Sequence, residues 1–175
     1  MNIISKILSI ILIIIFSTLI AILFGICHNQ ISFSISNELF EKYFFFQFGT
    51  SEWNITNPRI NAAIVGFLGT YWLGFYFGLI YSVIFLFLKT SNNLKYIFNS
   101  IVINFSFALI GSLLGYFIAI LFFDLENVPF KVEIDIINIK NYINAMFMHS
   151  GAYYGSYFGM AISIIYLIYK NQKNN

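Results

Sequence analysis

The sequence predicts an all-α integral membrane protein, a four-transmembrane-helix bundle that forms one domain over residues 1–175. Two observations support this fold class. Of the 175 residues, 59% are hydrophobic and only 9% are charged, whereas soluble domains carry about 25% charged residues. The apolar residues also gather into four runs, each long enough for the roughly 20 helical residues that cross a bilayer. The composition therefore excludes a soluble enzyme, a disordered chain and a disulfide scaffold.

The four apolar runs predict spans at about residues 7–27, 60–88, 96–123 and 143–169. Each run ends at charges, prolines or asparagine clusters, where a helix is expected to leave the bilayer. Asn57 and Pro58 fit the N-cap and the first helical position of the second span. The first run is too long for a signal peptide and no small-x-small cleavage pattern follows it, so we expect it to be an anchor.

The charges predict the orientation of the spans. One side of the predicted bundle carries five lysines and no acidic residue, namely Lys6, Lys89, Lys95, Lys170 and Lys173. The loops on the other side hold all seven acidic residues and only four basic ones. Because short cytoplasmic segments are rich in Lys and Arg, we expect both termini to lie in the cytoplasm.

The two longer loops, 28–59 and 124–142, are then extracytoplasmic, and we expect them to form a small cap. The alternation in Ile31–Ser36 and in Lys131–Ile136 is typical of extended segments, which could pair in that cap. The stretch 37–48 is typical of an interfacial helix with Asn37 as its N-cap. Its buried face is predicted to carry Leu39, Phe40, Tyr43 and Phe44.

Small residues recur at four-residue spacing in the last three spans. Lipid provides no hydrophobic drive for helix association, so close backbone approach at small residues favours packing instead. The candidate helix-packing residues are Ala62, Gly66, Gly74, Gly78, Gly111, Gly115, Gly151, Gly155, Gly159 and Ser163. Their number predicts a tight bundle.

Polar residues near the outer ends of the spans form the candidate functional cluster, which comprises His28, Glu38, Arg59, His149 and Tyr153. An ionisable residue inside a span often marks function. A nearby hydrogen-bond partner for His149 would give it a purely structural role, and we favour that interpretation. Arg59 is expected to pair with Glu38, Glu41 or Asp124, or to extend toward lipid headgroups.

The sequence contains no pattern that predicts a metal or a cofactor. Zinc would need three or four ligands, and the chain has two histidines and one cysteine. The histidines could ligate a b-type haem from facing helices, which we retain as a minor alternative. Asn104, in the third span, is expected to make an interhelical hydrogen bond rather than a substrate contact.

Four stretches of the chain resemble a known kind of protein: His28–Ser36, Phe46–Phe48, Arg59–Gly66 and Met148–Tyr153. Together they resemble an uncharacterised family of small four-span bacterial inner-membrane proteins. The resemblance implies a four-span fold in the bacterial inner (cytoplasmic) membrane, and it supplies no activity and no catalytic residue. Asn29 stands where the resemblance leads us to expect Asp, which weakens the case for an acidic site there.

The sequence leaves three classes of function open. The first is a non-enzymatic accessory or assembly component that acts through its extracytoplasmic face, with the bilayer, a membrane protein or a second copy as partner and no nucleic acid. The second is a small transporter or channel formed by oligomerisation, although the spans lack the internal charges that coupled transport usually needs. The third is a membrane enzyme or haem carrier that uses the outer histidines. We favour the first class and expect no enzymatic activity.

Overall fold

The chain is described by a computed structural model that covers residues 2–89, 92–132 and 135–173. Its four long helices are α1 (Ile3–Ile35), α4 (Pro58–Phe87), α5 (Asn93–Phe122) and α6 (Ile139–Lys173). They are 33, 30, 30 and 35 residues long and apolar enough to cross a membrane. The prediction of an all-α fold with four helices able to span a membrane is therefore confirmed, and the part of the chain that the structure covers contains no strand.

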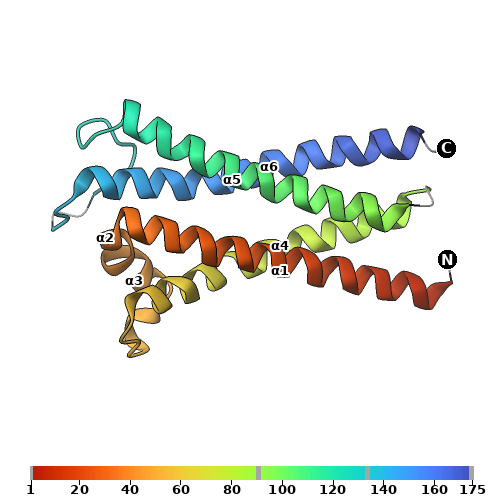
Figure 1. Cartoon of the computed structure of the whole chain (residues 1–175), viewed down its shortest axis with the longest axis horizontal. Helices are drawn as coiled ribbons and strands as arrows, with labels where there is room; N and C mark the ends of the chain where they lie inside the picture. The colour runs from red at the N-terminus through yellow and green to blue at the C-terminus, as the bar shows by residue number, and fades with distance from the viewer. Residues whose placement is uncertain (1, 90–91, 133–134, 174–175) are drawn as a thin grey trace.

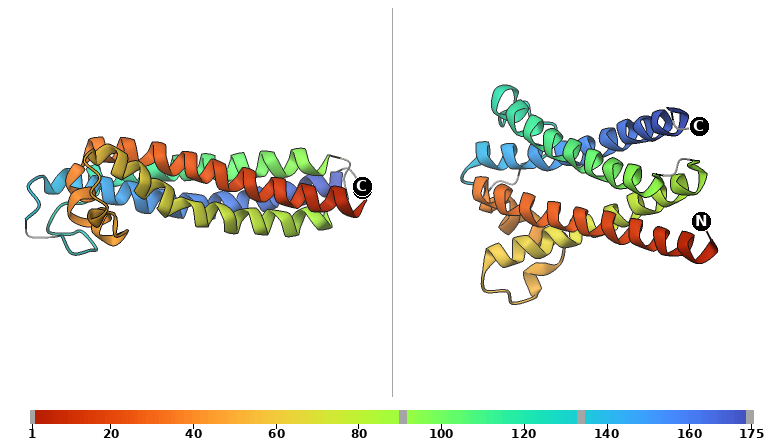
Figure 2. Two further views of the ribbon diagram at one scale, coloured as in Figure 1. Left: turned by 90° about the horizontal axis from the view of Figure 1, so that it is seen from below. Right: turned by 45° about the vertical axis from the view of Figure 1, so that its right-hand side comes forward.

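The four long helices run side by side, and both termini lie at the same end of the bundle (Figure 1). The helices form two hairpins, since α1 packs mainly against α4 and α5 mainly against α6. The two helices of each hairpin cross near their middles, and fewer contacts join one hairpin to the other (Figure 2). We call α1–α4 the first hairpin and α5–α6 the second.

Short helical segments lie beside the first hairpin at the end of the bundle opposite the termini, which we call the capped end (Figure 1). They are α2 (Asn37–Leu39), the π-helical turn η1 (Phe40–Phe44), α3 (Phe45–Gln47) and the 3₁₀ turn η2 (Thr50–Glu52). The carboxylate of Glu38 accepts hydrogen bonds from the backbone N–H groups of Ile137 and Asn138, at 2.7 and 2.8 Å. Lys42 forms an ion pair with Asp135. These contacts fix the short helices to the start of α6.

The structure corrects three expectations for the loops. Ile31–Ile35 is the last part of α1 rather than an extended segment. The neighbouring residues Ser32 and Phe33 are both buried, whereas in a strand with one exposed face they would point to opposite sides. Ser36 caps α2 in place of Asn37, since its Oγ accepts a hydrogen bond from the N–H of Leu39 at 3.3 Å. In Lys131–Ile136 the described residues form no strand, and residues 133 and 134 lie outside the described part.

The helix predicted over residues 37–48 is present, but its buried face differs from the predicted one. Leu39 and Phe40 are fully buried as expected, whereas Tyr43 is exposed and Phe45 is buried in its place. The cause is η1, in which the N–H of Phe45 bonds to the carbonyl of Phe40 five residues earlier. This wider turn rotates the following residues, so that Phe45 points toward the bundle.

Both hairpins close through glycines. In the first hairpin Gly66 faces Gly25 and Gly74 faces Ala21, and in the second hairpin Gly111 faces Gly151. A Cβ atom added at any of these glycines would overlap the backbone or the Cβ of the partner helix. Only glycine allows this approach, which lets dispersion contacts between the backbones hold the helices together. The predicted N-cap Asn57 is also present, and its Oδ1 accepts a hydrogen bond from the N–H of Arg59 at 2.9 Å.

Candidate functional site

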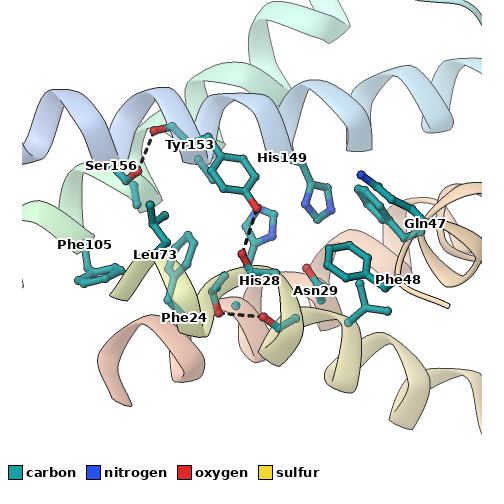
Figure 3. A pocket seen from close by; sticks show the side chains of 18 residues that line it. Phe24, His28, Asn29, Gln47, Phe48, Leu73, Phe105, His149, Tyr153 and Ser156 are labelled. Carbon is teal, nitrogen blue, oxygen red and sulfur yellow. Dashed lines mark hydrogen bonds between the residues drawn. The ribbon is translucent and has the colours of Figure 1, made fainter. Parts of the chain in front are cut away.

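A cavity of about 130 Å³ lies between the two hairpins near the capped end (Figure 3). Each of the long helices and the segment from η1 to Phe48 contributes to its wall. Aromatic side chains make most of the apolar wall, namely Phe24, Phe44, Phe48 and Phe105. The polar groups come mainly from α1 and α6, which contribute His28, Asn29, His149, Tyr153 and Ser156, while Gln47 and Thr70 add one each from α3 and α4.

The two histidines meet at this cavity. Their ring centroids are 4.5 Å apart and the ring planes are inclined at 81°. His28 of the first hairpin lies with its Nε2 at 3.1 Å from the Oγ of Ser112 in the second hairpin. His149 of the second hairpin lies with its Nε2 at 2.8 Å from the Oγ of Ser32 in the first. Each imidazole is thus hydrogen-bonded to a serine across the boundary between the hairpins.

Aromatic rings surround the histidine pair and limit how it can move. Phe24 stacks on His28 with the ring centroids 5.4 Å apart. Phe44 and Phe40 pack edge-on against His149 at 4.7 and 5.9 Å. These contacts fix the orientation of both imidazoles in a largely apolar environment.

Tyr153 provides a third polar link between the hairpins. Its hydroxyl donates a hydrogen bond to the carbonyl of Gly69 at 3.2 Å, and its own carbonyl accepts one from Ser156 Oγ at 2.7 Å. Gly69 is one of the residues that leave space here, and Thr70 beside it bonds its hydroxyl back to the carbonyl of Gly66 at 2.8 Å. The wall formed by α4 combines the small residues Gly66, Gly69 and Thr70 with Val65 and Leu73, and the wall formed by α6 carries larger polar side chains.

Two residues of the predicted polar cluster lie away from the cavity. Glu38 binds the start of α6, as described above. Arg59 is exposed, donates to Ser34 Oγ at 3.1 Å and to the carbonyl of Gln30 at 3.5 Å, and lies 5.2 Å from the centroid of the Phe33 ring. The predicted pairing of Arg59 with an acidic residue is therefore wrong, because the extra helical turns of α1 place these acceptors beside it.

Several cavity residues were missed by the sequence analysis. Ser32 and Ser112 bind the histidines, and Asn29 bonds through its Nδ2 to the carbonyl of Ala62 at 3.0 Å. A signal existed for Ser32, which lies four residues after His28 and therefore on the same helix face. Ser112 follows Gly111 in the packing stripe, but a single serine in a span carries little information of its own.

The cavity offers hydrogen bonds and aromatic surface without charge. No Asp, Glu, Lys or Arg side chain of the described residues lines it, so a histidine there has no carboxylate partner for acid–base work. Within the residues that the structure covers, no group of three or more His, Cys, Asp or Glu is placed to hold a metal ion. The two imidazoles contact each other directly, so the arrangement leaves no room for a haem between them.

A second polar group lies further from the capped end. The hydroxyl of Tyr81 is 2.6 Å from Ser163 Oγ and accepts a hydrogen bond from Asn104 Nδ2 at 3.1 Å. Asn104 thus makes the interhelical bond that the sequence predicted. Buried Phe77 and Phe105 belong to the apolar core that contains Tyr81, and this core separates the cavity from the end that carries the termini.

The comparisons with known proteins found no relative. No protein-family model, no curated protein and no solved structure matches this chain. What is established is the class that the fold defines, a protein with four helices able to span a membrane. The function has to be argued from the geometry of the cavity and of the capped end.

Proposed function

We propose that this protein is a non-enzymatic membrane component that acts through its capped end, where the cavity binds a small uncharged molecule. The observation that carries the proposal is the composition of the cavity wall. Two histidines and a tyrosine lie in it beside several phenylalanines, and no charged side chain of the described residues lines it. Pockets that bind small molecules combine apolar walls with a few convergent polar groups in the same way.

The properties of the cavity define the ligand class. A charged ligand would lose its hydration at a site without a counter-charge, which is costly inside a membrane protein. A cavity of about 150 Å³ is known to hold a benzene molecule, and this cavity has a volume of about 130 Å³. An uncharged group of about one ring, with hydrogen-bonding atoms, fits both constraints.

We further propose that the capped end is extracytoplasmic and that the protein resides in a bacterial inner membrane. The position of the lysines supports the orientation, and the resemblance to small bacterial inner-membrane proteins supports the location. Lys6, Lys89, Lys95, Lys170 and Lys173 all lie toward the end of the bundle that carries the termini. Under the positive-inside rule this end faces the cytoplasm.

Ligand binding is tested by analysing what remains attached to the purified protein. The protein is isolated in mild detergent, passed through gel filtration, extracted with organic solvent, and the extract is analysed by mass spectrometry. We expect one uncharged small molecule from the unaltered chain and a reduced amount from Tyr153→Phe, which keeps the ring and loses the hydroxyl. Ser106→Ala is the matched control, because Ser106 is exposed and bonds only to the carbonyl of Val102. Equal extracts from all three proteins would refute a site in this cavity.

An accessory or assembly role is the second candidate, and exposed apolar residues of the capped end favour it. Phe46, Trp53 and Ile137 are 66%, 54% and 91% exposed. Such side chains suit either the membrane interface or a partner protein. Isolation of the tagged protein with a stoichiometric membrane partner would support this role, and release of that partner by Phe46→Ser would assign the surface.

A channel through a single copy is not favoured. The core around Phe77 and Phe105 separates the cavity from the opposite end, and the Tyr81 group below it is bonded across the hairpins. A pore would therefore have to form between copies, and a monomeric molecular mass in several mild detergents would argue against that alternative.

A further inference from the structure

The two hairpins are built on the same pattern of helix contacts. In the first hairpin Gly25 of α1 contacts Gly66 and Thr70 of α4, and in the second hairpin Gly115 of α5 contacts Phe147 and Gly151 of α6. The two groups of contacts can be superimposed by residue number. Adding 90 to a residue number in α1 gives its counterpart in α5 (Gly25 gives Gly115), and adding 81 to a number in α4 gives its counterpart in α6 (Thr70 gives Gly151). The correspondence makes α5 the counterpart of α1, and α6 the counterpart of α4.

The same two shifts reproduce contacts along the rest of each hairpin. They convert three contacts of the first hairpin into contacts of the second: Ala21–Gly74 into Gly111–Gly155, Ile14–Gly78 into Asn104–Gly159, and Ile10–Ser82 into Ser100–Ser163. Antiparallel helices advance together, so one matched level fixes the next. The added information is that small residues recur at corresponding levels, namely Gly74/Gly155, Gly78/Gly159 and Ser82/Ser163.

The second halves of α4 and α6 agree with this register, whereas residues 58–73 share no identical residue with residues 139–154 at the same shift. With the same shift, residues 74–89 align with residues 155–170, and eight of the sixteen positions carry the same residue. The identical pairs are Gly74/Gly155, Tyr76/Tyr157, Phe77/Phe158, Gly78/Gly159, Ser82/Ser163, Ile84/Ile165, Leu86/Leu167 and Lys89/Lys170. Half of the identical positions are apolar or aromatic residues outside the packing stripe, so the agreement is more than a shared preference for glycine.

The hairpins meet through opposite faces rather than through equivalent ones. Leu73 and Phe77 of α4 are buried in the bundle, whereas their counterparts Tyr154 and Phe158 of α6 are 76% and 58% exposed. A two-fold axis would bury the same positions in both hairpins. The second hairpin is thus placed beside the first in the same orientation, like consecutive units of a stack, with the cavity at the boundary.

Comparing corresponding positions distinguishes residues that both hairpins need for packing from residues found only at the cavity between the hairpins. The cavity residues His149, Tyr153 and Ser156 of α6 correspond to Leu68, Trp72 and Phe75 of α4. In α1, His28 and Asn29 correspond to Ile118 and Ala119 of α5. Since the sister positions are apolar, the hairpin itself does not require any of these polar groups.

We propose that the chain is a tandem duplication of a two-helix hairpin, and that His28, His149 and Tyr153 are the groups by which the cavity recognises an uncharged single-ring ligand with hydrogen-bonding atoms. Each of the three has an apolar counterpart in the other copy. The second half of this proposal rests on the proposed ligand-binding function, whereas the duplication does not. The two halves are therefore tested separately.

The duplication is tested by disulfide formation in the full-length chain with Cys27 changed to Ser. The cysteine pairs Ile10→Cys/Ser82→Cys and Ser100→Cys/Ser163→Cys occupy corresponding positions, and we expect both to cross-link to a similar extent in membranes. The control pairs Ile10→Cys/Val83→Cys and Ser100→Cys/Ile164→Cys are displaced by one residue around the helix, and we expect at least a ten-fold lower yield. Cross-linking of one designed pair without the other would overturn the common register.

Recognition is tested by giving α6 the residues of its sister helix, in the variant His149→Leu/Tyr153→Trp/Ser156→Phe. The matched control Leu68→His/Trp72→Tyr/Phe75→Ser makes the reverse changes in α4 and leaves the cavity side chains in place. The probe is duroquinone, an uncharged ring with two hydrogen-bond acceptors, and benzoate is the charged probe. We expect duroquinone at about ten times its Kd to raise the midpoint of thermal unfolding by about 3 °C for the native chain and the control. Benzoate should not raise the unfolding midpoint of either protein.

The sister-residue variant should stay folded and lose the shift given by duroquinone. If that variant does not fold, the single changes His149→Leu and Tyr153→Phe take its place, and each should reduce the shift. A full shift in these variants would overturn the recognition role. If duroquinone does not raise the unfolding midpoint of the native chain, the ligand is not an uncharged single ring of this kind. A molecule recovered in the solvent extract would then show that the proposed binding function still holds.

Discussion

At the scale of single residues, the hydrogen bond between each histidine and a serine of the other hairpin contributes measurably to the free energy of unfolding. Ser32→Ala removes the partner of His149 Nε2 and leaves a ring nitrogen without its bond among aromatic rings. Interhelical hydrogen bonds in membrane proteins contribute about 0.6 kcal/mol, and an unsatisfied buried group costs about 1–3 kcal/mol. We therefore expect Ser32→Ala to lower the free energy of unfolding by about 1 kcal/mol, measured by denaturant titration in mixed micelles. Ser106→Ala should change it by less than about 0.5 kcal/mol, and an equal effect of the two changes would contradict this role.

The ion pair between Lys42 and Asp135 gives a pH-dependent connection between the cap and the loop before α6. The hydrogen bond and charge of Lys42 lower the pKa of the Asp135 carboxyl, and Asp135 raises the pKa of Lys42. The stabilisation by Asp135 is complete above its ordinary pKa of about 3.9 and is lost as the pH falls through the lowered value. The stabilisation by Lys42 is complete below about pH 10.4 and is lost as the pH rises through the raised value.

We therefore expect this connection to persist from about pH 4 to about pH 10. A nitroxide label at Ile137→Cys, with Cys27 changed to Ser, should become more mobile in electron paramagnetic resonance spectra above that range. In Asp135→Asn the label should already have the higher mobility at pH 7. An unchanged spectrum in Asp135→Asn would show that Glu38, which bonds to the N–H of Ile137, holds the loop without the ion pair.

Which site residues could be predicted from the sequence depends on how unusual each residue is in its surroundings. His28, His149 and Tyr153 stand out in apolar runs, and the structure places all three at the cavity. Serine is common in membrane helices, so Ser112 carried no comparable signal. The spacing of Ser32 from His28 was informative only if α1 continued past His28, as it does. Arg59 was assigned a wrong partner because its neighbours depend on where α1 ends, and hydropathy reports where the lipid-facing residues end rather than where the helix does.

At the scale of helices, the glycine contacts predict which substitutions separate a hairpin. A Cβ atom at Gly151 would overlap the carbonyl of Gly111, and backbone on the other side cannot rotate away as a side chain could. Overpacking costs about 1–3 kcal/mol, and we expect Gly151→Val to lie at the upper end of that range. The measurement is the midpoint of thermal unfolding in detergent. Ala161→Val, at an exposed position of the same helix, is the control, and similar midpoints for both variants would refute tight packing at this level.

The sequence predicted the existence of the long helices better than their ends and their pairing. Apolar length is enough to predict four spans, and the structure has them. The last turns of α1 bury the polar side chains His28, Asn29 and Ser32, so hydropathy could not show that the helix continues there. The packing role of Gly25 was missed although Ser17, Ala21 and Gly25 recur at four-residue spacing in α1 and are buried. That Gly25 meets Gly66 could be recognised only in three dimensions.

At the scale of the whole molecule, the duplicated hairpin gives both halves the same direction in the membrane. Each hairpin starts and ends at the end that carries the termini, and the loop within each hairpin lies at the capped end (Figure 1). Lys89 and Lys170, which are counterparts in the two copies, both follow the second helix of a hairpin or lie in its last turn. Because each copy carries the same inward signal, the two halves reinforce one orientation under the positive-inside rule.

This reinforcement predicts a single topology that a change in one hairpin cannot reverse. With Cys27 changed to Ser, a cysteine at Ile137, which is 91% exposed at the capped end, should react with a membrane-impermeant maleimide in intact cells. A cysteine at Lys173, in the last turn of α6, should react only after the membrane is permeabilised. Changing Lys89 to Glu should leave both results unchanged, because Lys6, Lys95 and Lys170 still flank the long helices at the end that carries the termini. Labelling of both cysteines in intact cells would reveal a mixed topology and would overturn the assignment of the cavity to the extracytoplasmic half.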